Sequence, residues 1–213
     1  MIVPNRFVFI NCPFDISYQT LFDAICFTII CCGYKPRCGH EQVDSGQERL
    51  ERLCVLMEQC QFGIHDISSV GHDPESKLPR FNMPFELGLF LGCARFGDDS
   101  QQSKKSLILD KERHRYQLFL SDISGRDVQE HNGDPRQAAM QTRTFLNAHG
   151  GRQLAGADYI WRLFEGFQKQ LPDICAECKL DAGNLTFPDY VHTTNLFLKS
   201  LPGLNRRSAP SPT

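Results

Sequence analysis

The chain has 213 residues, of which 41% are hydrophobic and 23% are charged, with a net charge of −2 and a pI near 6.4. These proportions are typical of a folded globular domain and allow a hydrophobic core. The slightly acidic charge speaks against nucleic-acid binding as the main function, because proteins of that class carry a concentrated basic surface.

The sequence also indicates where the protein works. No segment approaches the ~20 apolar residues that span a membrane, and the longest apolar run, 24–32, is too short. Residues 1–6 lack the basic and apolar regions of a signal peptide. Six of the ten cysteines lie in apolar segments, where free cysteine behaves as a small buried hydrophobe. They are Cys12, Cys26, Cys31, Cys32, Cys54 and Cys93. We therefore expect a cytoplasmic protein with reduced thiols and no membrane partner.

The first third of the chain alternates between strand and helix signals. Residues 6–11 (RFVFIN) predict a buried strand, and 17–32 predict a helix whose C-cap is Gly33. Residues 34–38 predict a second strand. The sequence Ser45-Gly46-Gln47-Glu48 is typical of a capping box and predicts the start of an amphipathic helix.

The alternation continues into the middle of the chain. Residues 62–67 (FGIHDI) predict a third strand. Residues 82–94 predict a helix that is apolar almost all round, and we therefore expect it to be buried. The segment 97–105 predicts a solvated loop, 106–109 a fourth strand that ends at Asp110, and Val128 a short fifth strand.

The last part of the chain is predicted to be mostly helical. The expected helices are 116–122, 135–148, 158–170 and 190–201, and we expect 208–213 (SAPSPT) to be a disordered tail. Alternating strands and helices predict an α/β fold with a doubly wound, mostly parallel sheet of flavodoxin-like type. We assign this domain to residues 1–150, followed by a helical C-terminal extension over 151–207.

Ligands of such sheets bind beyond the carboxyl ends of the strands, where the strand order reverses. This rule selects the residues that follow each predicted strand and the helix starts that face them. They are Asn11, Cys12, Pro13, Phe14, Asp15, the segment 39–45, the segment 66–69 and Asp110, with helix starts at Ser45-Gly46 and Asn82.

Glu86 is the candidate catalytic residue that the pattern favours most. It lies in the first turns of the predicted helix 82–94, and the residues three, four and seven positions on are Leu89, Phe90 and Cys93. Apolar surroundings favour the neutral form of a carboxyl group, whereas a helix N-terminus favours its charge. Opposed effects of this kind are typical of nucleophiles and general bases. The alternative is that Glu86 only complements the helix dipole.

Asp66 ends the third predicted strand and is expected to face the same cleft as Glu86. Two carboxylates from adjacent elements suit glycosidic chemistry, in which one acts on the anomeric carbon and the other manages a proton. The alternative is a structural aspartate that forms an Asx turn with Ser68. His65 alternates to the opposite side of the strand and is a weaker candidate.

The remaining candidates are contact residues. The loop from Cys12 to Asp15 is predicted to touch a ribose or phosphate, with Phe14 stacking on a base. The amides at Ser45-Gly46 offer an anion site, although the capping box explains them without a ligand. Asp110, with the basic run 113–115, is a candidate phosphate site. The alternative is that the basic run is a solvated turn. Metal binding is not expected, since the Cys175/Cys178 pair lacks a second half.

Three segments together resemble a known superfamily. They are Phe9-Ile10-Asn11-Cys12-Pro13-Phe14, Asp66, and Phe85-Glu86-Leu87-Gly88. This set, within 6–110, resembles the nucleoside 2-deoxyribosyltransferases, whose flavodoxin-like fold and catalytic glutamate the TIR-like NAD-cleaving domains share. The resemblance implies cleavage or transfer of an N-glycosidic bond, with Glu86 at the anomeric carbon, Asp66 in the sugar pocket and no cofactor beyond the NAD or nucleotide substrate. It also implies a role in bacterial defence after assembly.

Two departures from the family patterns keep three hypotheses open. The transferases carry an acid shortly before the glutamate, but 78–84 has none, and Arg80 there favours a phosphorylated substrate. The aromatic residue and cysteine of the TIR pattern are replaced by Met83-Pro84. The hypotheses are an N-glycosidase acting on NAD or a related nucleotide, a non-catalytic nucleotide-sensing or assembly module, and a nucleoside deoxyribosyltransferase. The C-terminal helices are expected to mediate self-association or to bind a protein partner.

Overall fold

The computed structural model describes residues 6–41, 46, 48–71 and 77–202. Its sheet has five parallel strands in the order β2-β1-β3-β4-β5, which confirms the predicted doubly wound, flavodoxin-like α/β fold. The strands are β1 (Phe7–Asn11), β2 (Lys35–Cys38), β3 (Phe62–Asp66), β4 (Lys105–Asp110) and β5 (Val128–Glu130).

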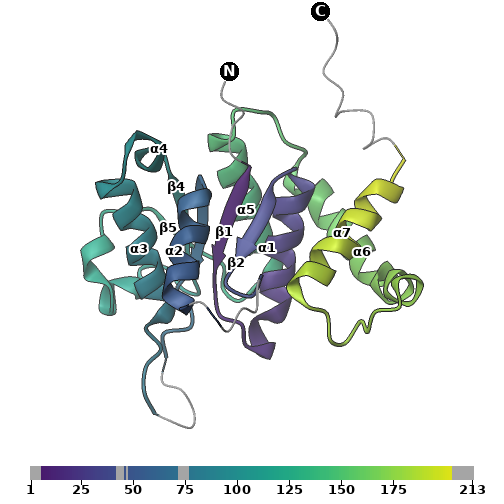
Figure 1. Cartoon of the computed structure of the whole chain (residues 1–213), viewed down its shortest axis with the longest axis horizontal. Coiled ribbons are helices and arrows are strands. Elements are labelled where there is room, and N and C mark those ends of the chain that lie inside the picture. Colours follow the sequence, from purple (N-terminus) through teal and green to yellow (C-terminus); the bar gives the residue numbers. More distant parts are fainter. Residues whose placement is uncertain (1–5, 42–45, 47, 72–76, 203–213) are drawn as a thin grey trace, which may run out of the picture.

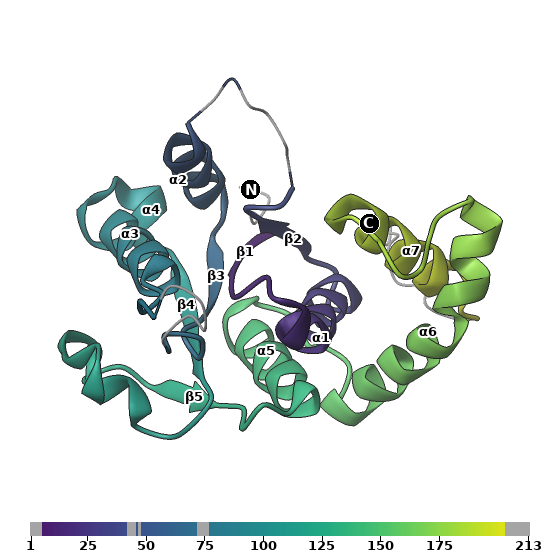
Figure 2. The ribbon, with the colours of Figure 1, turned by 90° about the horizontal axis from the view of Figure 1, so that it is seen from below.

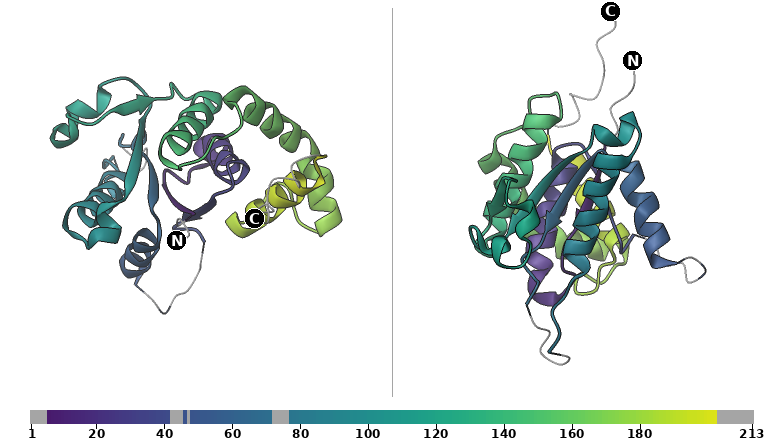
Figure 3. Two further views of the ribbon diagram at one scale, coloured as in Figure 1. Left: turned by 90° about the horizontal axis from the view of Figure 1, so that it is seen from above. Right: turned by 90° about the vertical axis from the view of Figure 1, so that its left-hand side faces the viewer.

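Helices cover both faces of the sheet (Figure 1, Figure 2). They are α1 (Gln19–Cys31), α2 (Arg49–Gln59), α3 (Asn82–Phe96), α4 (Asp99–Gln102), α5 (Pro135–His149), α6 (Ala157–Cys178) and α7 (Phe187–Ser200), with short 3-10 turns at Ile16–Tyr18, Arg115–Leu118 and Ser121–Ile123. Helices α1 and α5 pack on one face, and α2 and α3 pack on the other. Helices α6 and α7 lie outside α1, on the side away from the sheet (Figure 3).

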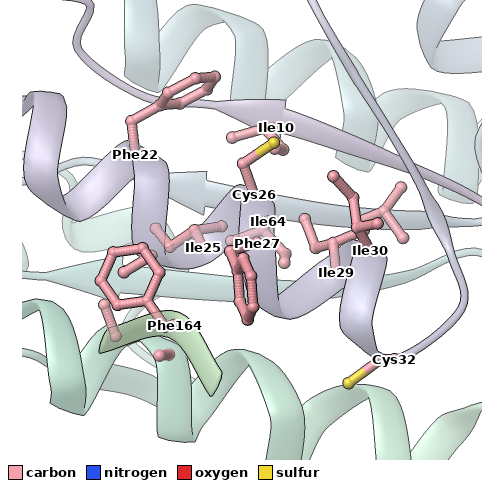
Figure 4. Close-up of a cluster of buried hydrophobic side chains, with 14 of the residues drawn as sticks. Ile10, Phe22, Ile25, Cys26, Phe27, Ile29, Ile30, Cys32, Ile64 and Phe164 are labelled. Atoms are coloured by element: carbon pink, nitrogen blue, oxygen red, sulfur yellow. The ribbon is translucent and has the colours of Figure 1, made fainter. Parts of the chain in front are cut away.

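Helix α1 is the centre of the main hydrophobic core. It is buried on both sides because its sheet-facing residues meet Ile10 and Ile64, while its outer face packs against α6 and α7 (Figure 4). The Phe27 ring lies 5.4 Å from that of Phe164 and 5.3 Å from that of Phe167, centroid to centroid. A helix buried all round must be apolar all round, which accounts for its sequence, LFDAICFTII.

The end of α1 confirms the prediction for Gly33. This residue has φ of +74°, and its N–H donates to the carbonyl of Ile30 at 2.7 Å, while the N–H of Tyr34 donates to the carbonyl of Ile29 at 3.0 Å. These two bonds form a Schellman motif, in which glycine adopts the left-handed conformation without steric cost.

Helix α3 is not buried all round, and that prediction was wrong. Met83, Leu87 and Phe90 are buried against the sheet, but the side chains of Phe85 and Phe96 are 53% and 87% exposed. The reason is position. Helix α3 lies at the outside of the molecule, and no further helical layer of the described residues covers it, whereas α6 and α7 cover α1 (Figure 2). An apolar helix sequence alone does not say whether such a second layer exists.

Several helix boundaries also differ from the predictions. Helix α6 continues to Cys178 through Pro172, because Leu171 and Cys175 on either side of the proline are buried. The loop 97–105 contains α4, which Asp98 caps, and 116–122 forms two 3-10 turns instead of a helix. Helix α2 begins at Arg49 with Glu48 as its N-cap. Ser45 lies outside the described residues, as does the tail 208–213.

Two general features complete the fold. None of the helices in the described part of the chain combines the length and hydrophobicity needed to cross a lipid bilayer. All ten cysteines are free thiols. The 1–150 boundary of the α/β domain stays a prediction, and the hydrophobic core runs without a break from α1 into α6 and α7.

Candidate functional site

The carboxyl ends of β1 and β3 form the switch point of the sheet. From these neighbouring strands the chain continues into α1 on one face and α3 on the other, which opens a crevice between the two connections in folds of this topology. The segments expected to supply ligand contacts, 11–15 and 66–69, therefore lie at the same edge.

Asn11 fixes the start of α3 at this edge. The side chain is buried, and its Nδ2 donates to the carbonyl of Met83 at 2.8 Å and lies 3.2 Å from Nδ1 of His65. Burial lowers the pKa of His65 to about 3, so the ring is neutral and is a poor general base. The hydrogen bond from Asn11 therefore connects the end of β1 to the first turn of α3. Glu86 lies about one turn further along this helix.

Glu86 is half-buried near the ends of β1 and β2. Burial raises the pKa of its carboxyl group above the ordinary value, and the positive charge of Arg49, at the start of α2, lowers that pKa in part. The Glu86 charge in turn raises the pKa of the thiols of Cys12 and Cys38. Among the residues that the structure describes, the carboxylate of Glu86 makes no hydrogen bond or ion pair. It is a partly desolvated acid whose oxygens are available to a ligand.

Asp66 has the opposite environment. Its side chain has 0% exposure, and Oδ2 accepts a hydrogen bond from the hydroxyl of Tyr18 at 2.5 Å and lies 3.0 Å from Nε2 of His131. Oδ1 accepts from the N–H of Ser68 at 2.8 Å, which is the Asx-type bond of the alternative interpretation. The N–H of Gly133 donates to Nδ1 of His131, so Nε2 is the ring nitrogen that faces Asp66.

The two carboxylates are close in the fold but do not share one open cleft. Both raise the pKa of the Cys12 thiol, whose burial is the largest cause of that increase. Asp66 is enclosed by Tyr18 and His131 on the α1 side, whereas Glu86 belongs to the α3 side. Asp66 therefore has a structural role at the switch point, and its carboxylate is not exposed to a ligand.

The rim of the site contains two pairs from the predicted contact loop. The ring of Phe14 stacks on that of His40, with centroids 3.7 Å apart and an angle of 18° between the planes. Asp15 forms an ion pair with Arg80 at 2.5 Å, and both side chains are 40% exposed. The second pair joins the loop after β1 to the segment before α3, so the predicted contact residues Asp15 and Arg80 do come together.

Asp110 is engaged in a buried ion pair, and the predicted phosphate contact is not available there as the protein stands. Its side chain has 0% exposure and pairs with Arg115, which also donates to the carbonyls of Ile67 and Ser68. Burial raises the pKa of Asp110, and the hydrogen bond from Arg115 counteracts this shift. This pair links the loops after β3 and β4.

The other predicted contact residues divide by exposure. Cys12 and Pro13 are buried, while Gly46 and Asn82 are exposed, and Ser45 is outside the described residues. Sequence reasoning missed Tyr18, Arg49 and His131, whereas His40 lies in the segment 39–45 that the rule for residues after strands selected. His131 directly follows β5, so the rule of residues after each strand would have found it had that strand been included. Tyr18 and Arg49 reach the site from a 3-10 turn and from the start of α2, for which no local signal exists.

No protein-family model, no curated protein and no solved structure matches the chain. Within the described residues, no three His, Cys, Asp or Glu side chains are grouped so that they would hold a metal ion. The chemistry of the site is therefore argued from its own geometry.

Proposed function

We propose that this protein cleaves the N-glycosidic bond of NAD or a related nucleotide, with Glu86 as the catalytic carboxylate. The observation that carries the proposal is the environment of Glu86. It is a partly desolvated acid at the switch point of a flavodoxin-like sheet, without a hydrogen-bonding partner among the described residues. The other two carboxylates at this edge of the sheet, Asp66 and Asp110, are buried and paired, as structural carboxylates are.

The single open carboxylate favours a particular leaving group. When the bond between ribose and nicotinamide in NAD breaks, the positively charged pyridinium takes the bonding electron pair and leaves as a neutral base. No proton donor is needed for this step. The carboxylate of Glu86 would stabilise or attack the positive anomeric carbon, and water would then complete the hydrolysis. A neutral purine or pyrimidine nucleoside generally needs its base protonated, and Asp66 is already committed to Tyr18 and His131.

The surroundings of Glu86 supply groups suited to a nucleotide. The charge of Arg49 lowers the pKa of the Glu86 carboxyl group, and Arg80 lies on the rim of the site in its ion pair with Asp15. Guanidinium groups bind phosphate oxygens in a bidentate manner. The partly exposed Phe14 ring, stacked on His40, offers an aromatic surface for a base. These residues support a phosphorylated substrate, which the position of Arg80 also predicts from the sequence.

The test is release of the base from NAD, NADP, nucleosides and nucleotides, followed by chromatography. Wild-type protein, Glu86→Gln and the control Glu51→Gln, an exposed glutamate in the first turn of α2, are compared. Each protein is assayed dilute and concentrated, since self-association through the C-terminal helices is expected to complete the site. Nicotinamide release that Glu51→Gln retains and Glu86→Gln loses by a factor of about a hundred or more supports the proposal. Equal release by both variants would refute it.

A non-catalytic nucleotide-binding module is the second candidate. The burial of Asp66 favours it, because the site then lacks the second free carboxylate of most glycosidases. Calorimetric titration with NAD and mononucleotides separates the two functions. A sensor binds one of them without releasing a base, and its affinity survives Glu86→Gln. A glycosidase loses turnover in the same variant.

A further inference from the structure

A cavity lined by Phe14 lies between the α/β layers and the C-terminal helices. Its volume is about 380 Å³, in the range of pockets that hold small molecules. It is formed by the loop after β1, the first two turns of α1, His40 and the segment that connects α6 with α7. Phe14 and His40 line it as well as the rim described above, whereas Glu86 is not among its lining residues.

Aromatic side chains form much of the cavity wall. The Phe22 ring lies 5.6 Å from Phe14 and 6.0 Å from Phe187, centroid to centroid. Tyr190 is buried beside them, and its hydroxyl donates to the main-chain carbonyl of Asp23 at 2.9 Å. The wall therefore joins α1 to α7 and offers the faces and edges of several rings to an occupant.

The cavity contains one unbalanced negative charge. Asp23 is the only acidic residue among the described lining residues, and neither Lys nor Arg is present among them. The carboxylate accepts one hydrogen bond on Oδ1, from Nε2 of Gln19 at 2.8 Å, and within the described part of the chain Oδ2 has no hydrogen-bond donor. An acid without a counter-charge, placed beside aromatic rings, is the arrangement that attracts a cation by charge and by the ring quadrupoles.

We infer that this cavity is a binding site for a small organic cation, an ammonium or amidinium attached to an apolar or aromatic group. The cationic nitrogen would donate to the open carboxylate oxygen of Asp23, and the apolar group would pack on Phe22 and Phe187. This site is distinct from the one proposed around Glu86, and its occupation requires no turnover.

The site has a defined dependence on pH. Burial raises the pKa of Asp23 to about 6, and the hydrogen bond from Gln19 opposes that shift. The titratable groups near it are His40, Tyr190 and Cys26. Burial lowers the pKa of His40 and raises those of Tyr190 and Cys26, so all three are neutral at pH 7. As the pH falls, Asp23 loses its charge and His40 gains one. Both changes weaken cation binding, and we expect about a tenfold loss of affinity between pH 7.5 and pH 5.

The test uses benzamidinium as the probe, titrated into the full chain by calorimetry. Benzyl alcohol and benzoate serve as the neutral and anionic counterparts. Benzamidinium should bind at least tenfold more tightly than either, and Asp23→Asn should remove that preference. The asparagine keeps the size of the side chain and the acceptor for Gln19. Asp99→Asn, an exposed acid at the start of α4, is the charge-matched control and should bind like wild type.

Amide NMR shifts on benzamidinium addition locate the probe. Shifts centred on Gly183, Asn184 and Phe187 support the site, and shifts confined to other parts of the chain would overturn it. Equal affinity for benzamidinium and benzyl alcohol, or an unchanged affinity in Asp23→Asn, would overturn it as well. Glu86→Gln should bind benzamidinium like wild type, because Glu86 does not line the cavity. A failure of the proposed glycosidase activity would therefore leave this result unchanged.

Discussion

Asp66 and Glu86 are two carboxylates at the same edge of one sheet, and their surroundings are opposite. Asp66 is fully enclosed and has a partner on each oxygen: Tyr18 and His131 at one, Ser68 at the other. Glu86 is half-buried, its charge is opposed by burial, and Arg49 only partly compensates.

The comparison teaches which acid stabilises the fold and which is available for chemistry. A buried carboxylate that accepts a hydrogen bond on each oxygen contributes to stability, and removing it is strongly destabilising. A partly desolvated carboxylate without partners costs stability and gains reactivity, which is a common trade at functional sites. Position at the carboxyl end of a strand does not distinguish the two cases.

Asp66→Ala is expected to give the largest effect. It leaves the Tyr18 hydroxyl buried without its acceptor and removes the carboxylate that lies 3.0 Å from Nε2 of His131. We expect the free energy of unfolding to fall by about 3 kcal/mol or more. Urea unfolding followed by circular dichroism measures this. Asp66→Asn, which keeps one acceptor oxygen, should lose about half as much.

The matched change on the other carboxylate should have the opposite sign. Glu86→Gln removes a charge that the folded state disfavours, so its midpoint of unfolding should equal or exceed that of wild type. If Glu86→Gln unfolds earlier than wild type and Asp66→Ala does not, the division between a structural and a reactive acid is wrong.

The second prediction concerns the pH dependence of base release. The Glu86 carboxylate must be ionised to act, and its pKa is raised, so the rate should fall about tenfold per pH unit below a pKa that lies above the ordinary 4.5. Arg49→Gln removes the charge that lowers this pKa and should move the acid limb of the profile to higher pH. Arg95→Gln, in the last turn of α3, is the control that should leave the profile in place.

The sequence predicted the fold well because each strand and its following helix carry a local signal. Apolar runs placed β1, β3 and β4, the segment 34–38 placed β2, Val128 marked β5, and Gly33 ended α1 as expected. Burial of whole helices was less predictable. Helices α3 and α1 are both rich in apolar residues, yet α1 is the one covered on both sides. Its outer face packs against α6 and α7, which lie more than a hundred residues further along the chain.

The location of the site was predictable from the sequence, but the contacts between its side chains were less so. The rule for residues after strands selected Asn11, Asp66 and Asp110, and all three lie at the carboxyl edge of the sheet. Their partners come from elsewhere. Tyr18 is on a 3-10 turn and His131 follows the shortest strand, so a one-dimensional pattern does not show that Asp66 would be enclosed.

Asp23 is intermediate between the two acids and gives a third, smaller prediction. It has one hydrogen-bond partner and a pKa near 6, so its folded form favours the proton. Its contribution to stability is fully present below the unfolded pKa near 3.8 and is lost as the pH rises through about 6. Asp23→Asn should therefore stabilise the protein at pH 7 by about 1 kcal/mol, after allowance for partial exposure, and by nothing near pH 3.

Chemical denaturation of Asp23→Asn at both pH values checks this sign. Asp99→Asn, whose side chain is exposed, should show no difference between them beyond the experimental error. Stabilisation of Asp23→Asn that is equal at pH 3 and pH 7 would mean that the charge of Asp23 is not the cause.

The smallest effect is expected on the exposed face of α3 beside Glu86. Phe85 is 53% exposed, so Phe85→Ser should change the free energy of unfolding by less than about 0.5 kcal/mol. This change sharpens the comparison, because the open side of the switch point should tolerate substitutions that the enclosed side does not. Differential scanning calorimetry would record it. A loss as large as that of Asp66→Ala would show that the Glu86 side is enclosed as well.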